Sequence, residues 1–228
     1  ICCKMFRLVV VAHPDDEGLG FGGAGVNYVN NGDQIQPLIL CGDVNARTLR
    51  PSNEELKKDT YDASVILGFE KPILGSFPNL KMNIIPHLEI VQFIEKYIIE
   101  YMPDFIYTHH PNDLNDDHQI VSKACMAASR IYQRRNQNKR IKGLYYMEIL
   151  SSTEWALNNA QNNFHPNYFV NIEDSLERKV KALQSYKDVM RESPHPRSIE
   201  CLEALSIFRG SQSNFKKAEA FQIAFQTD

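Results

Sequence analysis

Two short segments of the chain each combine histidine with several carboxylates. The first is His13-Pro-Asp-Asp-Glu17, and the second runs from Thr108 to His118 with the sequence THHPNDLNDDH. Imidazole nitrogens and carboxylate oxygens are common ligands of catalytic zinc, which takes three protein ligands and leaves one position for water. We expect His13, Asp16 and His118 to supply these ligands. Two histidines and one carboxylate also describe the metal site of Fe(II) oxygenases, so that enzyme class is a first alternative.

Each of the two segments has an ordinary structural explanation when it is considered alone. A histidine that follows a strand is more often a turn residue than a ligand, and two aspartates before a helix commonly cap it and complement its dipole. Here both segments follow an apolar, strand-like run and precede a helix-like one. This matching pair of settings favours a shared metal site over two unrelated turns.

The elements that would position these side chains alternate along the chain. Apolar, β-branched runs predict strands over residues 7–12, 36–41, 104–108 and 143–149. Apolar residues at helical spacing predict helices over about 18–31, 54–67 and 87–101 and from residue 118 onward, and the last third, from residue 174, is expected to be charged and mostly helical. This alternation is typical of an α/β fold whose mostly parallel sheet carries helices on both faces.

The length of the chain and the position of the two segments complete the expected architecture. With 228 residues, the chain is expected to form one domain over residues 1–228. In open parallel sheets, sites lie in the crevice beyond the carboxyl ends of the strands. Both acid-and-histidine segments follow such ends, so we expect them to converge.

A glycine-rich pattern beside the first segment suggests a second alternative, a nucleotide-binding module without catalysis. Gly18-Leu-Gly20-Phe-Gly-Gly23 matches G-x-G-x-x-G. Five residues, three of them acidic, separate the strand from the first glycine, so a pyrophosphate would meet carboxylates rather than bare backbone N–H groups. We interpret these glycines as allowing the helix to pack closely on the sheet.

The composition favours a small substrate in a reducing compartment. The net charge is -3 and the pI is about 6.2, which gives no electrostatic reason to expect nucleic acid or an anionic membrane surface as a partner. No segment approaches the roughly 18 apolar residues of a membrane span. The five cysteines are odd in number and form no C-x-x-C pair, so we expect a cytoplasmic location.

The two segments resemble the signatures of a known family. Ala12-His-Pro-Asp-Asp-Glu17 and Asn112-Asp-Leu-Asn-Asp-Asp-His118-Gln-Ile-Val resemble the first and second motifs of the PIG-L/LmbE-like zinc-dependent deacetylases. The resemblance continues through residues 148–155, 194–198, 209–210 and 218–221, and so covers nearly the whole chain. It implies a Rossmann-like sheet, one zinc ion, and removal of acetyl groups from N-acetylglucosamine-type sugars or their conjugates.

The resemblance also implies roles for individual residues. Carried over position by position, it gives His13, Asp16 and His118 as the zinc ligands and Asp15 as the general base. Many members of the family have a histidine three residues before the last ligand, where this chain has Asn115.

Because of that departure, proton delivery to the leaving amine has more than one candidate. His109 or His110 could substitute for the missing histidine, or Asp15 could return the proton that it accepts while Asn115 donates a hydrogen bond to the oxyanion. Asp117, next to the last ligand, is expected to support the ligands from the outer shell.

Contacts to the substrate are less clearly indicated. Arg47 and Arg50 follow the second predicted strand, and Glu148 and Arg197 lie in the later family-like segments. The expected partner is an acetylated amino sugar or sugar conjugate. The sequence leaves open whether that sugar is free, nucleotide-linked or lipid-linked, and whether the protein forms a homo-oligomer.

Overall fold

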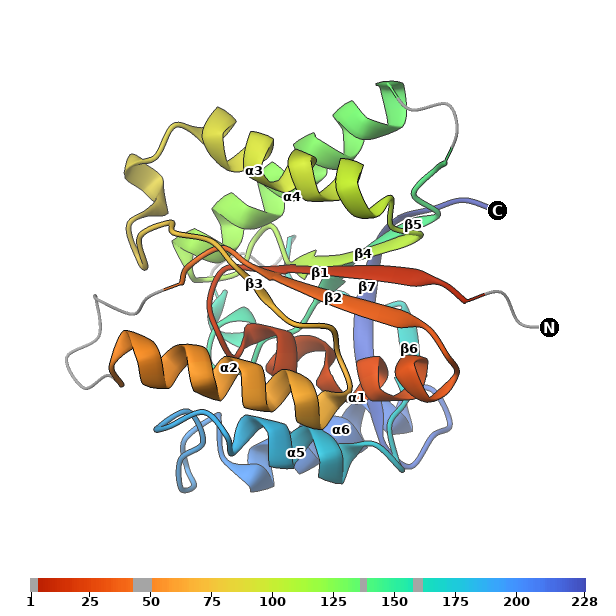
Figure 1. Ribbon diagram of the computed structural model, residues 1–228. Helices are drawn as coiled ribbons and strands as arrows, with labels where there is room; N and C mark the ends of the chain where they lie inside the picture. The colour runs from red at the N-terminus through yellow and green to blue at the C-terminus, as the bar shows by residue number, and fades with distance from the viewer. Residues whose placement is uncertain (1–3, 43–50, 136–138, 158–161) are drawn as a thin grey trace.

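The computed structural model describes residues 4–42, 51–135, 139–157 and 162–228. Within these residues a seven-stranded sheet has the order β3-β2-β1-β4-β5-β7-β6, with helices on both faces (Figure 1). The strands are β1 (Phe6–Val11), β2 (Gln34–Ile39), β3 (Ile73–Leu74), β4 (Phe105–His109), β5 (Gly143–Met147), β6 (Tyr168–Asn171) and β7 (Ala218–Gln226). The helices are α1 (Asp16–Asn30), α2 (Asn53–Leu67), α3 (His87–Tyr101), α4 (Asp116–Arg135), α5 (Leu176–Leu183) and α6 (Ile199–Ser211), with short 3-10 turns η1 (Met82–Ile84) and η2 (Thr153–Trp155).

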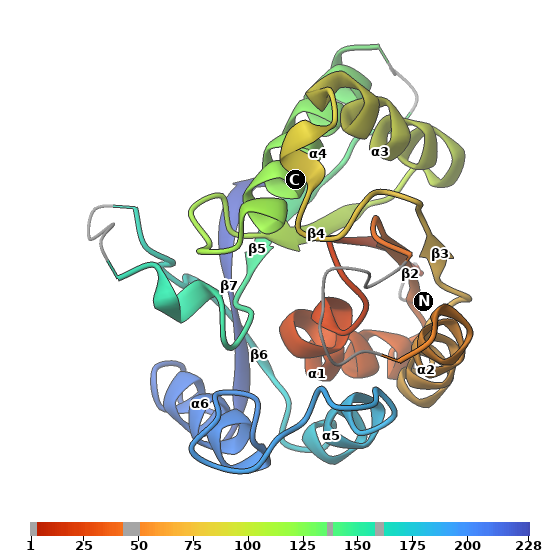
Figure 2. The ribbon, with the colours of Figure 1, turned by 90° about the vertical axis from the view of Figure 1, so that its left-hand side faces the viewer.

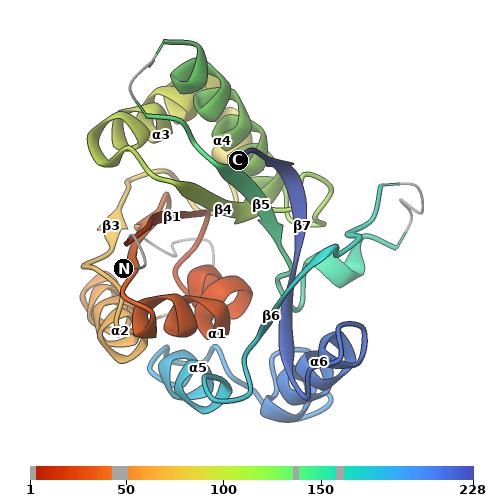
Figure 3. The ribbon, with the colours of Figure 1, turned by 90° about the vertical axis from the view of Figure 1, so that its right-hand side faces the viewer.

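The sheet is mostly parallel, as the sequence predicts. Strands β3, β2, β1, β4 and β5 run parallel to one another, and β7 pairs antiparallel with both β5 and β6 (Figure 3). Strand β1 lies inside the sheet between β2 and β4, and its residues from Arg7 to Val11 are all buried. A continuous β-branched run suits this position because both of its faces are covered.

The C-terminal third differs from the expectation of mostly helical structure, which is wrong for its last segment. Helices α5 and α6 are present, but residues Ala218–Gln226 form β7, the longest strand. Phe221, Ile223 and Phe225 alternate with smaller or polar residues, which is the period of a strand. The partners of this strand lie far away in the sequence, so only tertiary pairing makes its structure evident.

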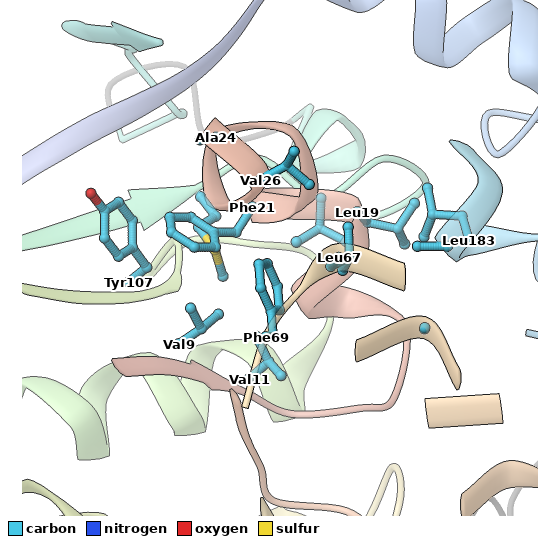
Figure 4. Packing of buried hydrophobic residues seen from close by; sticks show 14 of the residues in the cluster. Val9, Val11, Leu19, Phe21, Ala24, Val26, Leu67, Phe69, Tyr107 and Leu183 are labelled. Atoms are coloured by element: carbon cyan, nitrogen blue, oxygen red, sulfur yellow. The ribbon is translucent and has the colours of Figure 1, made fainter. Parts of the chain in front are cut away.

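Two hydrophobic clusters pack on opposite faces of the sheet. Helices α1, α2, α5 and α6 cover one face, and α3 and α4 cover the other (Figure 1). Successive residues of a strand point to opposite faces, so Val9 and Val11 join the first cluster while Leu8 and Val10 join the second. In the first cluster the ring of Phe21 lies 4.3 Å from that of Tyr107, above β1 (Figure 4).

The glycine-rich pattern lies inside α1 rather than in a loop before it. The helix begins at Asp16, so Gly18, Gly20 and Gly23 are helical residues. A Cβ at Gly20 would lie 2.5 Å from Ile149 Cδ1. These contacts confirm that glycine allows the helix to pack closely on its neighbours, and they count against a dinucleotide-binding loop.

A buried ion pair fixes α1 against the C-terminal part of the chain. Lys179 Nζ lies 2.7 Å from Glu219 Oε1 and donates to the backbone oxygen of Leu19 at 2.6 Å. The carboxylate of Glu219 accepts hydrogen bonds from the backbone N–H groups of Gly23 and Ala24 at 2.8 and 2.7 Å. The pair therefore satisfies backbone groups of α1 directly, and α1 carries Asp16 in its first turn.

Among the described helices, none combines the length and apolar character needed to cross a membrane.

Candidate metal centre

The two acid-and-histidine segments meet at one edge of the sheet. His13 follows β1, Asp16 is the first residue of α1, and His118 lies in the first turn of α4. Strands β1 and β4 are hydrogen-bonded neighbours, so the loops that follow them lie together; Figure 2 views the molecule from this edge. The convergence that the sequence predicts is therefore present.

Three side-chain atoms form a compact triangle at this edge. His13 Nδ1 lies 3.2 Å from His118 Nε2, and Asp16 Oδ2 lies 3.3 Å from each of these nitrogens. All three side chains are buried. Ligands bonded at about 2.05 Å to a tetrahedral zinc ion would lie about 3.3 Å from one another. The triangle therefore fits a tetrahedral divalent metal ion with one position left open.

Outer carboxylates select which nitrogen of each histidine faces the triangle. Asp117 Oδ2 lies 3.0 Å from His13 Nε2, and Asp113 Oδ1 lies 3.2 Å from His118 Nδ1. Each carboxylate can accept the N–H of its histidine, which leaves the opposite ring nitrogen to coordinate a metal. Asp117 also accepts the backbone N–H groups of Leu80 and Met82, so it ties the loop before α3 to the site.

The charges of the cluster suit a cation. Burial acts to lower the pKa of His118, but Asp16 and Asp113 outweigh it and raise that pKa to about 9. Burial likewise acts to raise the pKa of Asp16, yet His118 and His13 hold it well below its usual range. Without a metal, the buried carboxylates are thus balanced by protons on the histidines. A divalent ion can replace those protons.

A second group of potential ligands shares His13 but fits a metal less well. Ligand atoms of His13, Cys41 and Asp117 lie within 4.8 Å of one another. Burial raises the pKa of the Cys41 thiol, which opposes formation of the thiolate that a metal requires. The Asp117 carboxylate already accepts hydrogen bonds from two backbone N–H groups. The first triangle is therefore the better candidate.

Asp15 is held rigidly beside the triangle. Its backbone has a positive φ of 103°, a conformation that costs a non-glycine residue about 1–3 kcal/mol and often marks functional sites. Arg197 Nη1 donates to Asp15 Oδ2 at 2.9 Å, and Glu17 Oε2 accepts the Asp15 backbone N–H at 3.1 Å. The Tyr186 hydroxyl donates to the other oxygen of Glu17, and burial raises the pKa of Glu17 to about 8. Glu17 thus holds the backbone of Asp15 in place, and Tyr186 in turn holds the Glu17 carboxyl group.

Asn115 lies at the N-terminus of α4 and borders the site. Its Oδ1 accepts the backbone N–H of Asp117 at 2.9 Å, which caps the helix. The cap occupies the carbonyl oxygen of the Asn115 side chain and leaves the amide N–H groups available to donate. Asn115 also lines the cavity in front of the triangle.

The two histidines considered for proton delivery are both engaged in other contacts. His109 stacks on His118 with ring centroids 3.8 Å apart, and its Nε2 accepts the backbone N–H of Ala12 at 2.8 Å. Burial, reinforced by the charge of His118, lowers the pKa of His109 to about 3, so it holds no extra proton near neutral pH. His110 packs edge-on against Tyr146 and Phe164. Neither histidine lines the cavity.

Among the described residues, the structure places only one of the predicted substrate contacts, Arg197, in the cavity. Arg197 lines the cavity and bonds both Asp15 and, at 2.8 Å, the Ser151 hydroxyl. Glu148 instead forms two hydrogen bonds to Arg209, at 2.6 and 2.9 Å, and does not line the cavity. The geometry therefore gives no support to Glu148 as a substrate contact. Arg47 and Arg50 lie outside the described residues.

The cavity in front of the triangle has a volume of about 550 Å³. It is lined by His13, Asn79, Leu80, residues 114–118, Ser151, Ser152 and Arg197. Sequence reasoning gave no role to Asp113 and Thr153. Ser152 and Thr153 donate their hydroxyls to Asp113, so all three residues fix His118. Asp113 belongs to the predicted polar segment, but nothing in its spacing distinguishes it from Asp116.

An α/β fold with a buried two-histidine, one-carboxylate triangle that could hold a metal ion defines the class of protein as an α/β protein of the LmbE-like type. The family model PIG-L, described as GlcNAc-PI de-N-acetylase, matches residues 8–129. The chain belongs to this family. The matched residues contain both segments that form the triangle.

Solved structures share the fold over nearly the whole chain. A conserved protein from Thermus thermophilus superimposes with a TM-score of 0.81 at 21% identity and covers 99% of this chain and 97% of its own. An N,N'-diacetylchitobiose deacetylase from Pyrococcus horikoshii superimposes with a TM-score of 0.79 at 17% identity, and the match covers 96% of this chain and 83% of that protein. The 4-carboxy-2-hydroxymuconate hydratase of Pseudomonas putida superimposes with a TM-score of 0.77 at 18% identity, and the match covers 99% of this chain and 98% of that protein. The likeness is one of fold, and that fold carries both a deacetylase and a hydratase.

Proposed function

We propose that the protein is a zinc-dependent hydrolase that removes the N-acetyl group from an amino sugar. The observation that carries this proposal is the triangle of His13 Nδ1, Asp16 Oδ2 and His118 Nε2, whose spacing fits tetrahedral zinc and whose histidines each have a carboxylate behind them. Membership of the PIG-L family supports deacetylation. The α/β fold counts against the oxygenase alternative, because such sites usually lie on β-barrels.

Zinc held by His13, Asp16 and His118 would polarise the amide carbonyl and lower the pKa of a water molecule to about 7. Asp15 accepts the proton of the attacking water, and the same carboxylate then returns it to the amine as the C–N bond breaks. The products are acetate and the free amino sugar. This assignment uses one group as base and acid, because His109 is held neutral with its Nε2 accepting the Ala12 N–H, and His110 packs against Tyr146 and Phe164.

Two neighbours of Asp15 would assist these steps. Arg197 fixes the orientation of the Asp15 carboxylate through its 2.9 Å contact. Asn115 would donate an amide N–H to the oxygen of the carbonyl as negative charge develops there. The remaining lining combines polar residues, Asn79, Ser151 and Asp116 among them, with Leu80 and Leu114. Its 550 Å³ volume lies in the range of small-molecule sites and suits a sugar ring.

The test is a screen of acetylated sugars with zinc-loaded protein, in which primary amine and acetate are both quantified. N-acetylglucosamine, N,N'-diacetylchitobiose and their phosphorylated or nucleotide-linked forms cover the main substrate classes. The expected result is release of one acetate per amine, at equal rates with and without oxygen. Oxygen-dependent turnover would favour the oxygenase alternative, and addition of water without acetate release would favour a hydratase.

Replacing Asp15 with asparagine tests the base directly. Asparagine tolerates a positive φ, so the variant should keep the local backbone. Turnover should fall by about two to four decades, the typical share of general acid–base catalysis, while zinc content stays near that of the wild type. Asp62→Asn is the matched control because Asp62 lies on α2 and pairs with Lys58 at the surface. Normal turnover in Asp15→Asn would rule out this role.

A further inference from the structure

A second, smaller cavity adjoins the one in front of the metal triangle. Its volume is about 130 Å³, and it shares Ser151 and Arg197 with the larger cavity. Arg197 therefore faces both spaces, with its Nη1 on Asp15 and its Nε on the Ser151 hydroxyl. Ser151 and Arg197 thus form the shared boundary of the two cavities.

The second cavity is rich in cationic groups although the protein as a whole is acidic. Lys187, Arg191 and Arg197 line it, and Asp188 is the acidic residue of the lining. The chain has a formal net charge of -3. Positive charge is thus concentrated at a particular place next to the reaction site, which is the arrangement that attracts an anionic ligand.

The cationic side chains of the outer wall are weakly compensated. Lys187 lies 3.7 Å from Glu55, and the two side chains are 58% and 53% exposed, so this pair contributes little. Arg191 Nε donates to the backbone oxygen of Asp188 at 3.4 Å, and among the described residues no carboxylate forms an ion pair with its guanidinium. Both charges remain available to a ligand.

His195 adds a neutral donor to the same wall. Its Nδ1 accepts the backbone N–H of Arg197 at 3.0 Å, so in the neutral ring the proton resides on Nε2, which can donate. Partial burial and the positive charges of Arg191 and Arg197 lower the pKa of His195. The local field at this ring is therefore positive.

We propose that the second cavity binds a phosphoryl group carried by the acetylated sugar substrate, with Lys187, Arg191 and His195 as its ligands. The proposal rests on the proposed deacetylation and names the class of its substrate. Guanidinium, ammonium and imidazole N–H groups together match the several acceptor oxygens of a phosphate, and charge-assisted bonds of this kind are strong. Binding there would anchor the sugar while its acetamido group lies at the triangle.

The experiment compares phosphorylated and unphosphorylated substrates in matched variants of the zinc-loaded enzyme. The substrates are N-acetylglucosamine, its 1-phosphate, its 6-phosphate and UDP-N-acetylglucosamine, which separate a phosphomonoester from a diphosphate linkage. The test variant is Lys187→Gln/Arg191→Gln. The control is Lys181→Gln/Arg134→Gln, which removes the same charge at exposed positions outside both cavities.

The wild type should prefer at least one phosphorylated substrate, by about tenfold or more in kcat/KM, the effect of one charge-assisted hydrogen bond. The test variant should lose this preference, mainly through a higher KM, and the control should keep it. Inorganic phosphate should inhibit the wild type and the control more strongly than the test variant. Equal kcat/KM for phosphorylated and unphosphorylated sugars, or an unchanged preference in the test variant, would overturn the proposal.

A binding measurement separates this proposal from the proposed function. Calorimetric titration with glucosamine 6-phosphate and glucosamine 1-phosphate reports on the cavity without any hydrolysis. Binding that the test variant loses and the control keeps supports the phosphate site, even if no acetylated sugar is hydrolysed. In that case only the assignment of deacetylation fails. Binding that is equal in all three proteins would contradict the phosphate site itself.

Discussion

Asp113→Asn should weaken metal binding without touching a ligand. Asp113 is fully buried, and its carboxylate lies 3.2 Å from His118 Nδ1 while it accepts the hydroxyls of Ser152 and Thr153. The carboxylate therefore orients His118 and increases the basicity of its coordinating nitrogen. Asparagine has nearly the same shape, but it lacks the charge.

The electrostatics of Asp113 show that the fold strongly favours its charged form. Burial acts to raise its pKa, but His118, followed by Ser152, brings it from 3.8 down to about 2. At about 1.4 kcal/mol per pH unit, the charged form is stabilised by about 2.5 kcal/mol in the folded protein. This contribution is present above the ordinary pKa and is lost as the pH falls toward 2. Loss of an outer carboxylate typically costs 10- to 100-fold in metal affinity, about 1.4–2.7 kcal/mol.

The assay is a competition titration of zinc between the protein and a chromophoric chelator at neutral pH. Asp116→Asn is the matched control, because Asp116 is an exposed residue of the same segment and the charge change is identical. Asp113→Asn should bind zinc about 10- to 100-fold more weakly than the wild type, and Asp116→Asn should differ from it by no more than a few-fold. Wild-type affinity in Asp113→Asn would refute the reasoning that the outer carboxylate prepares His118.

Three further outcomes are expected. Lys179→Met leaves Glu219 as an unpaired buried carboxylate and should lower the free energy of unfolding by about 3–5 kcal/mol in urea titrations; a loss below about 1 kcal/mol would contradict the structural role of the pair. Because the pKa of His118 is raised to about 9 without metal, zinc uptake at pH 7 should release protons and should tighten as the pH rises toward 9. Calorimetry in buffers of different ionisation enthalpy measures this release, and an uptake that releases none would disagree with the assigned charges. Gly20→Ala should lower the free energy of unfolding, measured by thermal unfolding, by about 1–3 kcal/mol, because the new methyl group would lie 2.5 Å from a side-chain atom of Ile149. Unchanged stability would show that α1 can shift.

Most of the scaffold around the site could be predicted from local sequence patterns. The β-branched run over residues 7–12 predicts β1 to within one residue, because a continuous apolar run needs cover on both faces. Helix α4 also carries its own signal, since Val121, Cys125 and Ala128 share a buried apolar stripe at helical spacing. Strand β7 has a weaker local signal, the alternation of Phe221, Ile223 and Phe225. Its neighbours β5 and β6 lie far away in the chain, and Ile223 is the β-branched residue that it contains.

The residues of the candidate site also differ in whether local sequence patterns predict their positions. His13, Asp16 and His118 could be proposed as a group because each follows or begins an element whose type is evident locally. The contacts of His110 and Glu148 depend on distant partners, the ring of Phe164 and the guanidinium of Arg209, and neither residue lines the cavity. The basic cavity beside Arg197 likewise arises from tertiary packing, because its walls come from separate segments of the chain.

Anomalous diffraction at the zinc edge, from crystals grown with one equivalent of zinc, tests the central claim most directly. The proposed function requires one strong peak within bonding distance of His13 Nδ1, the Asp16 carboxylate and His118 Nε2, with Asp117 and Asp113 behind the two histidines. A peak among His13, Cys41 and Asp117, or no ordered zinc at either group, would contradict it.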